Sequence, residues 1–221
     1  MKIPFTVEQF FDVFETYNQA IWPAQIGVYV LGLMIVAALL KPIDYSDQFI
    51  SGVLALFWVW TGVLYHIFYF SLINTLALIF GVFFVLQGVA LFFSGVWLKR
   101  LTFEITMSTR AIVGAVFVVF AMLLYPLIGS ALGHHYPRTP MFGVAPCPLT
   151  IFTFGVFLFV RTKIAWYLYL IPLLWSLIGM SAAISLKVPQ DYALVVSGVV
   201  GSTFIVLQNR QLANVHNRRR I

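Results

Sequence analysis

Residues 74–97 of this chain read NTLALIFGVFFVLQGVALFFSGVW and decide its fold. The stretch has no Asp, Glu, Lys or Arg, and the basic pair Lys99 and Arg100 follows it almost directly. An α-helix needs about 20 mostly apolar residues to cross the hydrocarbon core of a bilayer. The stretch is therefore predicted to be a transmembrane helix that ends at a basic membrane boundary.

Six further apolar runs accompany this one. The chain has 221 residues, 62% hydrophobic and only 9% charged, whereas soluble domains carry about 25% charged residues. Strands of a membrane barrel would be about 10 residues long and would alternate in polarity. We therefore predict an all-α fold, a seven-helix transmembrane bundle that forms a single integral membrane domain over residues 1–221. The spans are expected at residues 22–40, 48–70, 74–97, 111–129, 147–160, 164–186 and 191–208.

The first 21 residues do not read as a secretory signal peptide, because they contain Glu8, Asp12 and Glu15 and lack a basic start before an apolar stretch. Residues 6–18 place aromatic side chains on one face of a helix and acids on the other. This pattern predicts a short amphipathic helix lying at the membrane interface within residues 1–21. Such Phe-rich segments serve as packing elements or as lipid sensors, and the packing role is favoured here.

Basic residues fall on alternate connections between the spans, which predicts the orientation. The N-terminus is expected outside and the C-terminus in the cytoplasm, with residues 209–221 as a basic cytoplasmic tail, because Lys and Arg are enriched in cytoplasmic loops. The same topology and lipid headgroups explain the net charge of +6, which therefore does not indicate nucleic acid. Ten basic residues are then cytoplasmic (Lys41, Lys99, Arg100, Arg110, Arg161, Lys163, Arg210, Arg218, Arg219 and Arg220) and three are outside (Lys2, Arg138 and Lys187).

Small residues repeat along the third span. Asn74, Gly81, Gly88 and Gly95 recur at intervals of seven and share one slowly drifting helix face. Glycines on such a face let a neighbouring helix backbone approach closely. The pattern predicts a packing contact inside the bundle rather than a permeation path.

The interiors of the predicted spans lack Asp, Glu, Lys and Arg, and Asp191 stands at a span end. Intramembrane ionisable residues mark proton relays, ion paths and voltage sensors. Their absence argues against a proton-coupled carrier and a voltage-gated channel. It also argues against a retinal protein, which needs a Schiff-base lysine, and the last span has neither that lysine nor the histidines of a ceramidase-like hydrolase.

The unusual polar residues gather at the predicted outer face, around residues 133–150 (GHHYPRTPMFGVAPCPLT). The span that follows, 147–160, has 14 residues, or about 21 Å at about 1.5 Å per residue. It is shorter than the hydrocarbon core of about 30 Å, so the preceding loop is expected to dip inward. Non-helical backbone at that depth must be surrounded by protein or line a cavity. The sequence therefore predicts an outer ligand pocket formed by Tyr65, His66, Asn74, Tyr125, His134, Tyr136, Arg138 and Thr150.

Cys147, the only cysteine, stands between Pro146 and Pro148. Proline suits the first turn of a helix, so Cys147 is expected at a helix start, where the positive end of the helix dipole favours a thiolate. An anion has the same helix end available to it.

Three uses of this cluster remain open. A tentative metal set consists of His66, His134, His135 and Cys147, and suits Zn or Cu. In a structural alternative, the Tyr, His and Asn side chains hold the irregular loop by hydrogen bonds. A nucleophilic cysteine with a histidine base lacks a recognisable orienting acid, although Glu15 or Asp191 can reach the outer face. We expect His66, Tyr136 and Cys147 to approach one another, and we assign no catalytic residues.

Several motifs resemble a family of small bacterial integral membrane proteins known only as a domain of unknown function. They are W-x-G-x-x-Y-H (Trp60 to His66), I-N (Ile73 and Asn74), and G-H-x-Y-P followed by F-G-x-x-P-C-P-x-T-I-F-T (Gly133 to Thr153). The opening PFTVEQFFDVFETYNQAIWP is similar as well. The resemblance covers essentially the whole chain and implies a multi-pass protein of the bacterial inner membrane, without an established activity.

The leading functional prediction is a small inner-membrane protein with a periplasm-facing pocket that binds, and in one version transports, a small molecule or metal ion. One alternative is a membrane enzyme or redox protein with a Cys–His metal site, although a non-enzymatic role is favoured. Another alternative is an accessory subunit of a larger membrane complex, with a homo-oligomer as a further assembly. The lipid bilayer is the one partner that the composition requires.

Overall fold

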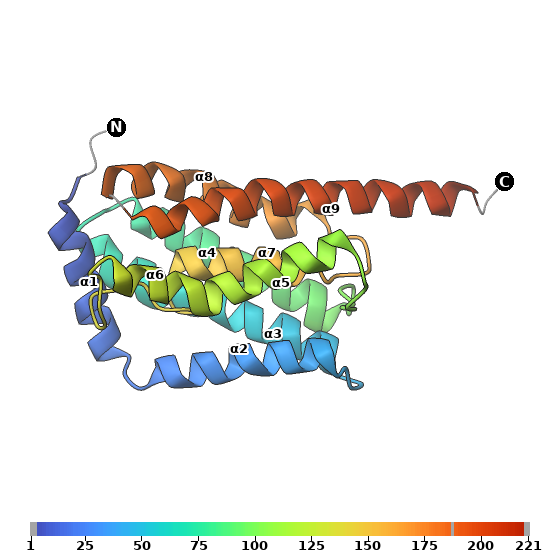
Figure 1. Cartoon of the computed structure of the whole chain (residues 1–221), viewed down its shortest axis with the longest axis horizontal. Coiled ribbons are helices and arrows are strands. Elements are labelled where there is room, and N and C mark those ends of the chain that lie inside the picture. Colours follow the sequence, from blue (N-terminus) through green and yellow to red (C-terminus); the bar gives the residue numbers. More distant parts are fainter. Residues whose placement is uncertain (1–3, 187, 219–221) are drawn as a thin grey trace.

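The computed structural model describes residues 4–186 and 188–218. Within these ranges the chain is helical and contains no strand, apart from an isolated bridge between Phe103 and Val160. The prediction of an all-α fold is therefore confirmed. Most helices run lengthwise through the molecule, and the N-terminal helix crosses one end of them (Figure 1).

The helices follow the apolar runs of the sequence. Three of them continue through wider π-helical turns, labelled η1, η3 and η4, and two short 3₁₀ turns are labelled η2 and η5. In chain order the elements are α1 (Val7–Ala20), α2 (Ala24–Leu40), α3 (Ser46–Trp60), η1 (Thr61–Tyr69), η2 (Phe70–Leu72), α4 (Ala77–Leu91), η3 (Phe92–Trp97), α5 (Thr109–Val119), η4 (Phe120–Leu124), α6 (Tyr125–Ala131), α7 (Pro146–Phe157), α8 (Trp166–Leu186), η5 (Pro189–Asp191) and α9 (Tyr192–Arg218).

An apolar helix occupies each of the seven predicted spans, but their lengths differ. Five helical segments are long and apolar enough to cross a membrane, or six if the bent pair α1 and α2 is one span. The helix α7 is shorter, with 12 residues. The chain is thus a membrane protein, while seven crossings and their orientation stay predictions.

The predicted basic tail, 209–221, is helical as far as Arg218 and continues α9 past the bundle (Figure 1). Lys2, Lys187, Arg219 and Arg220, which enter the charge argument, lie outside the described residues.

The helix α1 closes one end of the bundle, which we call the α1 end. Its start is fixed by a capping box, in which the Gln9 backbone N–H donates to Thr6 Oγ1 at 3.2 Å and the Thr6 N–H donates to Gln9 Oε1 at 2.8 Å. The axis of α1 turns by 87° from that of α2. Its aromatic face, with Phe14 and Tyr17, is buried against protein. The amphipathic helix expected within residues 1–21 is therefore a packing element, described here from residue 4.

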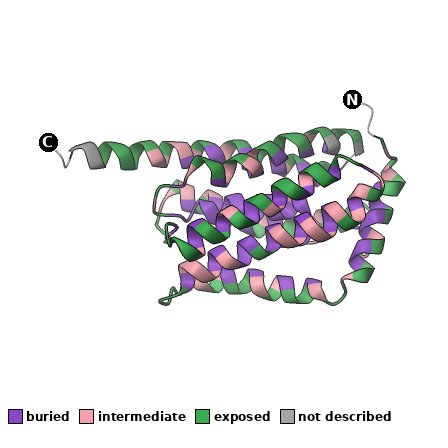
Figure 2. Ribbon diagram, turned by 180° about the vertical axis from the view of Figure 1, so that it is seen from behind, coloured by how far each residue is buried: buried purple, intermediate pink, exposed green. Residues whose placement is uncertain are grey.

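The short helix α7 lies at the centre of the molecule and contacts α3, α5, α8 and α9. Cys147 is its one half-buried residue, and all its other side chains are buried, whereas surrounding helices keep exposed outer faces (Figure 2). Twelve residues span about 18 Å at about 1.5 Å each. Non-helical chain therefore continues at both ends of α7, where protein surrounds it, as backbone at this depth requires.

At the end opposite α1, two extended segments satisfy each other's backbone groups. The N–H of Glu104 donates to the carbonyl of Phe159, and the N–H of Arg161 donates to the carbonyl of Thr102, each at 2.8 Å. Asp47 Oδ1 accepts a hydrogen bond from the Phe103 N–H at 2.9 Å. These contacts allow the chain to leave α7 without exposing unpaired backbone groups to lipid.

The glycine repeat of the third span marks the contact of α4 with α3 and η1. A Cβ atom placed on Gly81 would lie 2.8 Å from the carbonyl oxygen of Gly62, and a Cβ on Gly62 would lie equally close to that of Gly81. A Cβ on Gly88 would lie 2.7 Å from the carbonyl oxygen of Ala55. The predicted close packing is therefore confirmed, while Asn74 at the start of the repeat has a different environment.

Candidate functional site

A cavity of about 360 Å³ lies beneath α1, between η1, α4, α7, α8 and η5. We call it the α1 cavity. Its wall is mostly apolar and rich in aromatic residues, and its polar lining is sparse. The aromatic residues are Phe5, Phe10, Phe14, Tyr65, Phe70, Phe80 and Trp175, and the polar ones are Asn74, Cys147, Ser181 and Asp191.

The floor of the α1 cavity holds a buried carboxyl group, that of Asp191, which is 5% exposed. The Tyr125 hydroxyl donates a hydrogen bond to Asp191 Oδ1 at 2.5 Å. The Cys147 side chain lines the same cavity. Three different helical segments thus bring one acid and two weak donors together at this point.

The aromatic wall continues into a buried cluster around His66. The ring of Phe14 stacks on that of Tyr65, with centroids 4.9 Å apart, while the His66 ring meets Trp175 edge-on at 5.0 Å. His66 is fully buried, and neither of its ring nitrogens has a hydrogen-bond partner. The indole N–H of Trp175 has none either. His66 therefore stands behind the cavity wall, and Trp175 separates it from the cavity as part of the lining.

The start of α7 reaches the floor of the α1 cavity but offers few donors. Pro146 and Pro148 have no backbone N–H, and the N–H of Leu149 donates to the carbonyl of Ala145 at 3.3 Å. Of the N–H groups that a helix start usually presents, that of Cys147 remains. The anion site considered from the sequence therefore has little hydrogen-bonding capacity, although the positive end of the helix dipole is retained.

The rim of the cavity is more exposed than its floor. Leu76 is 55% exposed and Ile178 is 41% exposed, whereas Tyr65 and Asp191 at the floor are buried. Leu76 stands directly before α4, and Ile178 belongs to α8. The cavity therefore opens between these two helices, beside exposed apolar side chains and the exposed Ser181.

Polar contacts between α1 and the connection 133–145 fix the roof of the site. Asn18 Nδ2 donates to the carbonyls of Pro137 at 2.7 Å and Thr139 at 2.8 Å. The Tyr17 hydroxyl donates to the carbonyl of Val144 at 3.0 Å and accepts from Trp60 Nε1 at 2.9 Å. These bonds satisfy carbonyl groups of a loop that has no helical partners of its own. They support the structural alternative, with α1 supplying the side chains.

On the other side of α1 lies a shallow surface depression of about 430 Å³, the α1 hollow. Arg138 pairs there with Asp12 at 2.7 Å and Glu15 at 3.4 Å. His134 stacks on Phe11 with ring centroids 4.1 Å apart. Burial, and to a smaller extent the charge of His135, lowers the pKa of His134 below its usual value.

The pocket predicted from the sequence is thus divided between two places. Tyr65 and Asn74 line the α1 cavity together with Cys147, and Tyr125 supports it through Asp191. His134, Tyr136 and Arg138 belong to the α1 hollow. The hydroxyl of Thr150 donates to the carbonyl of Pro146 within its own helix, at 2.8 Å, and His66 stands behind the cavity wall.

The tentative metal set is not assembled. In the part of the chain that the structure describes, no three His, Cys, Asp or Glu side chains lie close enough to hold a metal ion. His134 belongs to the hollow, and Nδ1 of His135 lies 3.0 Å from Ser130 Oγ, while Cys147 lines the cavity. Tyr136, which was expected to approach Cys147 and His66, lines the hollow on the other side of α1, with its hydroxyl 3.4 Å from the carbonyl of Asn18.

Two important members of the site were missed as pocket residues. The sequence indicates Asp191 only as an acid able to reach the outer face, and Trp175 lies inside an apolar span where nothing distinguishes it from a packing residue. The signal for Asp191 was available, since it is the one acid at the outer end of a predicted span. Asn18 and Tyr17 were hidden in the amphipathic pattern of α1.

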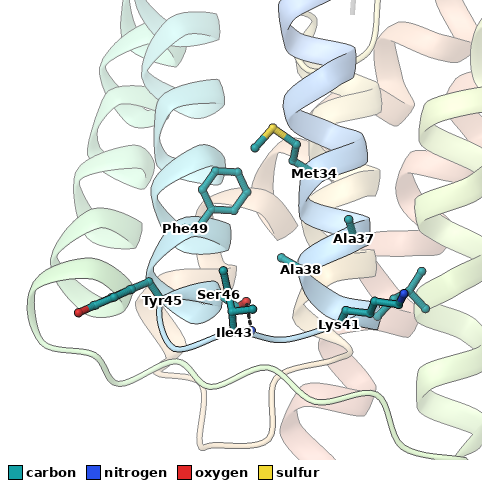
Figure 3. A pocket seen from close by; sticks show the side chains of 9 residues that line it. Met34, Ala37, Ala38, Lys41, Ile43, Tyr45, Ser46 and Phe49 are labelled. Atoms are coloured by element: carbon teal, nitrogen blue, oxygen red, sulfur yellow. Dashed lines mark hydrogen bonds between the residues drawn. The ribbon is translucent and has the colours of Figure 1, made fainter.

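A second groove, of about 670 Å³, lies between α2 and α3 at the end opposite α1 (Figure 3). Apolar side chains, including Met34 and Phe49, line it, and Lys41 and Tyr45 stand at its lower edge in that view. Its open, apolar walls lie on the outer surface of two membrane helices, which suits lipid chains. Its polar lining residues are Lys41, Tyr45 and Ser46, and no acid lines it.

Residues 7–217 match the model of a family of unknown function, DUF6064. No curated protein and no solved structure matches the chain.

Proposed function

We propose that this chain, which belongs to the DUF6064 family of unknown function, binds a small molecule in the α1 cavity. We further propose that it resides in the bacterial inner membrane with its α1 end facing the periplasm. The basic residues on the opposite connections support this orientation. Transport of the bound molecule is one use of such a site.

The observation that carries the proposal is an aromatic cavity with a few convergent polar groups. Its volume of about 360 Å³ falls in the range of small-molecule pockets, about 300–1,000 Å³. Such pockets are mainly apolar and orient their ligand through a small number of polar groups. Asp191, Cys147 and Asn74 supply those groups here.

The roof contacts support a binding site that is already formed before the ligand arrives. Asn18 and Tyr17 tie α1 to the connection 133–145 through buried hydrogen bonds. A cavity whose walls are already held needs little ordering when the ligand binds, and this reduces the entropic cost of binding. No arrangement of described residues favours the Cys–His metal alternative in the same way.

Native mass spectrometry tests this function on protein released from nanodiscs made directly from bacterial membranes. A bound small molecule is expected on the wild type and is reduced in Ile178→Trp, whose indole would block the exposed rim. Leu33→Trp is the matched control, because Leu33 is 60% exposed on α2 and does not line the cavity. Equal adducts on both variants, or no adduct on the wild type, would contradict binding in the α1 cavity.

A further inference from the structure

We infer that the α1 cavity selects an amphipathic amine or ammonium compound, with its cationic group at Asp191 and its apolar body against the aromatic wall. The inference rests on the proposed function and names the chemical class of its ligand. A buried acid, a set of aromatic rings and an apolar opening lead to it.

The first observation is the electrostatic situation of Asp191. Its carboxyl group is buried, and the side chain that donates a hydrogen bond to it, the Tyr125 hydroxyl, is neutral. Ion pairs within residues 4–186 and 188–218 join Arg138 to Asp12 and Glu15, and Arg161 to Glu104. None of them supplies Asp191 with a cation. A buried carboxylate is costly unless it is paired, so a cationic ligand would provide the missing partner.

The second observation is the aromatic lining. The rings of Phe14, Tyr65 and Phe70 form a continuous stack, with successive centroids 4.9 Å and 5.5 Å apart, and Trp175 stands on the same lining. Because these three rings are stacked face to face, they offer a ligand mainly apolar ring edges. Trp175, the aromatic residue that attracts cations most strongly, has no stacked partner among the described residues. The stacked rings hold the apolar part of a ligand, so one wall serves both halves of an amphipathic molecule.

An anionic ligand fits the same cavity poorly. The prolines at positions 146 and 148 remove two of the backbone donors that a helix start would offer an anion. The unpartnered indole N–H of Trp175 is one remaining donor. Asp191 itself repels a second negative charge in a site from which most water is excluded.

The third observation concerns the way into the cavity. Ile178, at the rim, lies eight residues before the end of α8 at Leu186, or about 12 Å along the helix at about 1.5 Å per residue. Its neighbour across the opening, Leu76, is also apolar and exposed. Ile178 places one side of the opening within α8, whereas Leu76, directly before α4, places the other side at a helix end. The opening therefore lies near the membrane boundary, where an amphipathic ligand that partitions into the bilayer reaches it.

Equilibrium dialysis tests the inference on the purified full chain in uncharged maltoside micelles. The probes are benzyltrimethylammonium, its uncharged isostere neopentylbenzene, and the anion phenylacetate. The cation is expected to bind the wild type at one equivalent and more tightly than either other probe. Asp191→Asn should lower the affinity for the cation by about tenfold or more, as loss of a buried charge partner does. The affinity for the neutral isostere should stay unchanged.

Asp44→Asn is the matched control, since it removes an exposed acid at the opposite end and should leave all three affinities unchanged. If Asp191→Asn does not fold, as judged by size-exclusion chromatography and circular dichroism, the ranking of probes on the wild type still decides. Tighter binding of the neutral isostere, or equal cation affinity in a folded Asp191→Asn, would overturn the inference and leave the proposed function intact. Binding of none of the three probes at one equivalent would count against both.

Discussion

The hydroxyl of Tyr125, at the start of α6, donates a hydrogen bond to Oδ1 of Asp191, at the end of η5. The two residues are 66 positions apart in the sequence. Their contact fixes the carboxyl group at the floor of the α1 cavity and links α6 to η5. Of the two residues, Tyr125 was predicted to belong to the pocket and Asp191 was not.

Tyr125→Phe is therefore expected to destabilise the protein. The ring keeps its packing, but Asp191 loses its closest donor, and hydrogen bonds to charged groups contribute about 1.5–3 kcal/mol. Reversible unfolding by denaturant in micelles measures the change. Tyr45→Phe is the control, because Tyr45 is exposed at the opposite end. Equal stabilities of the two variants would show that the Tyr125 hydroxyl contributes nothing.

Asn18→Ala is expected to loosen the connection above α7. The change removes both donors to the carbonyls of Pro137 and Thr139 and leaves buried acceptors unpaired, at a cost of about 1–3 kcal/mol each. Hydrogen exchange measured by mass spectrometry should rise across residues 134–145. Gln19→Ala is the control, because Gln19 is the exposed neighbour of Asn18. Unchanged hydrogen exchange across residues 134–145 in Asn18→Ala would show that Asn18 does not hold this connection.

Acidification is expected to weaken the contact of α1 with residues 133–138. The pKa of His134 is lower in the folded protein than its usual value of 6.5, so the unfolded chain binds the proton first as the pH falls through that value. Stability is therefore fully present above about pH 6.5 and decreases below it. The titratable and charged groups facing His134 in the hollow are Glu8, Glu15, His135 and Arg138, with Asp12 paired to Arg138.

Thermal unfolding between pH 7.5 and 5 measures this effect. His134→Phe preserves the stacking on Phe11 and should flatten the pH dependence, whereas His135→Gln, which changes an exposed residue, should retain most of it. If the unfolding midpoint falls equally with decreasing pH in the wild type and in His134→Phe, the pH dependence belongs to another group.

Gly81→Ala is expected to destabilise the packing of α4 against η1. The added methyl group would approach the carbonyl oxygen of Gly62 at 2.8 Å, so the helices must move apart, and overpacking of this kind costs about 1–3 kcal/mol. Gly27→Ala is the control, because no atom lies within 4 Å of the Cβ position there. Unfolding midpoints in micelles compare the two, and equal midpoints would contradict the close approach.

The orientation is tested by cysteine labelling in a Cys147→Ser background. Arg138→Cys is expected to react with a membrane-impermeant maleimide added outside, and Glu104→Cys only after the membrane is made permeable, because the basic residues favour a cytoplasmic position for the second site. Both residues have exposed side chains. Labelling of residue 138 from the cytoplasmic side alone would overturn the predicted topology and the periplasmic position of the cavity.

The sequence by itself determined the all-α membrane character and the places of the helices. Hydrophobicity is a property of each segment, so the run 74–97 already predicts the helix that α4 and η3 form. The shortness of the span at 147–160 is also a local property, and it correctly indicated non-helical chain beside α7 within the protein. The glycine spacing at Gly81 and Gly88 predicted close helix packing for the same reason.

Only the tertiary structure decided which polar residues meet. Tyr65, Cys147 and Asp191 come from segments far apart in the chain. The position of each residue along its helix gives its depth in the membrane, but not which residues of other helices it contacts. The path of α1 across the bundle end separates the cavity from the hollow, so His134 and Cys147 lie apart although they are only 13 positions apart in the sequence. Depth in the membrane follows from counting residues along one helix. Contacts between residues of different helices depend on how all the helices pack, and no single segment of sequence determines them.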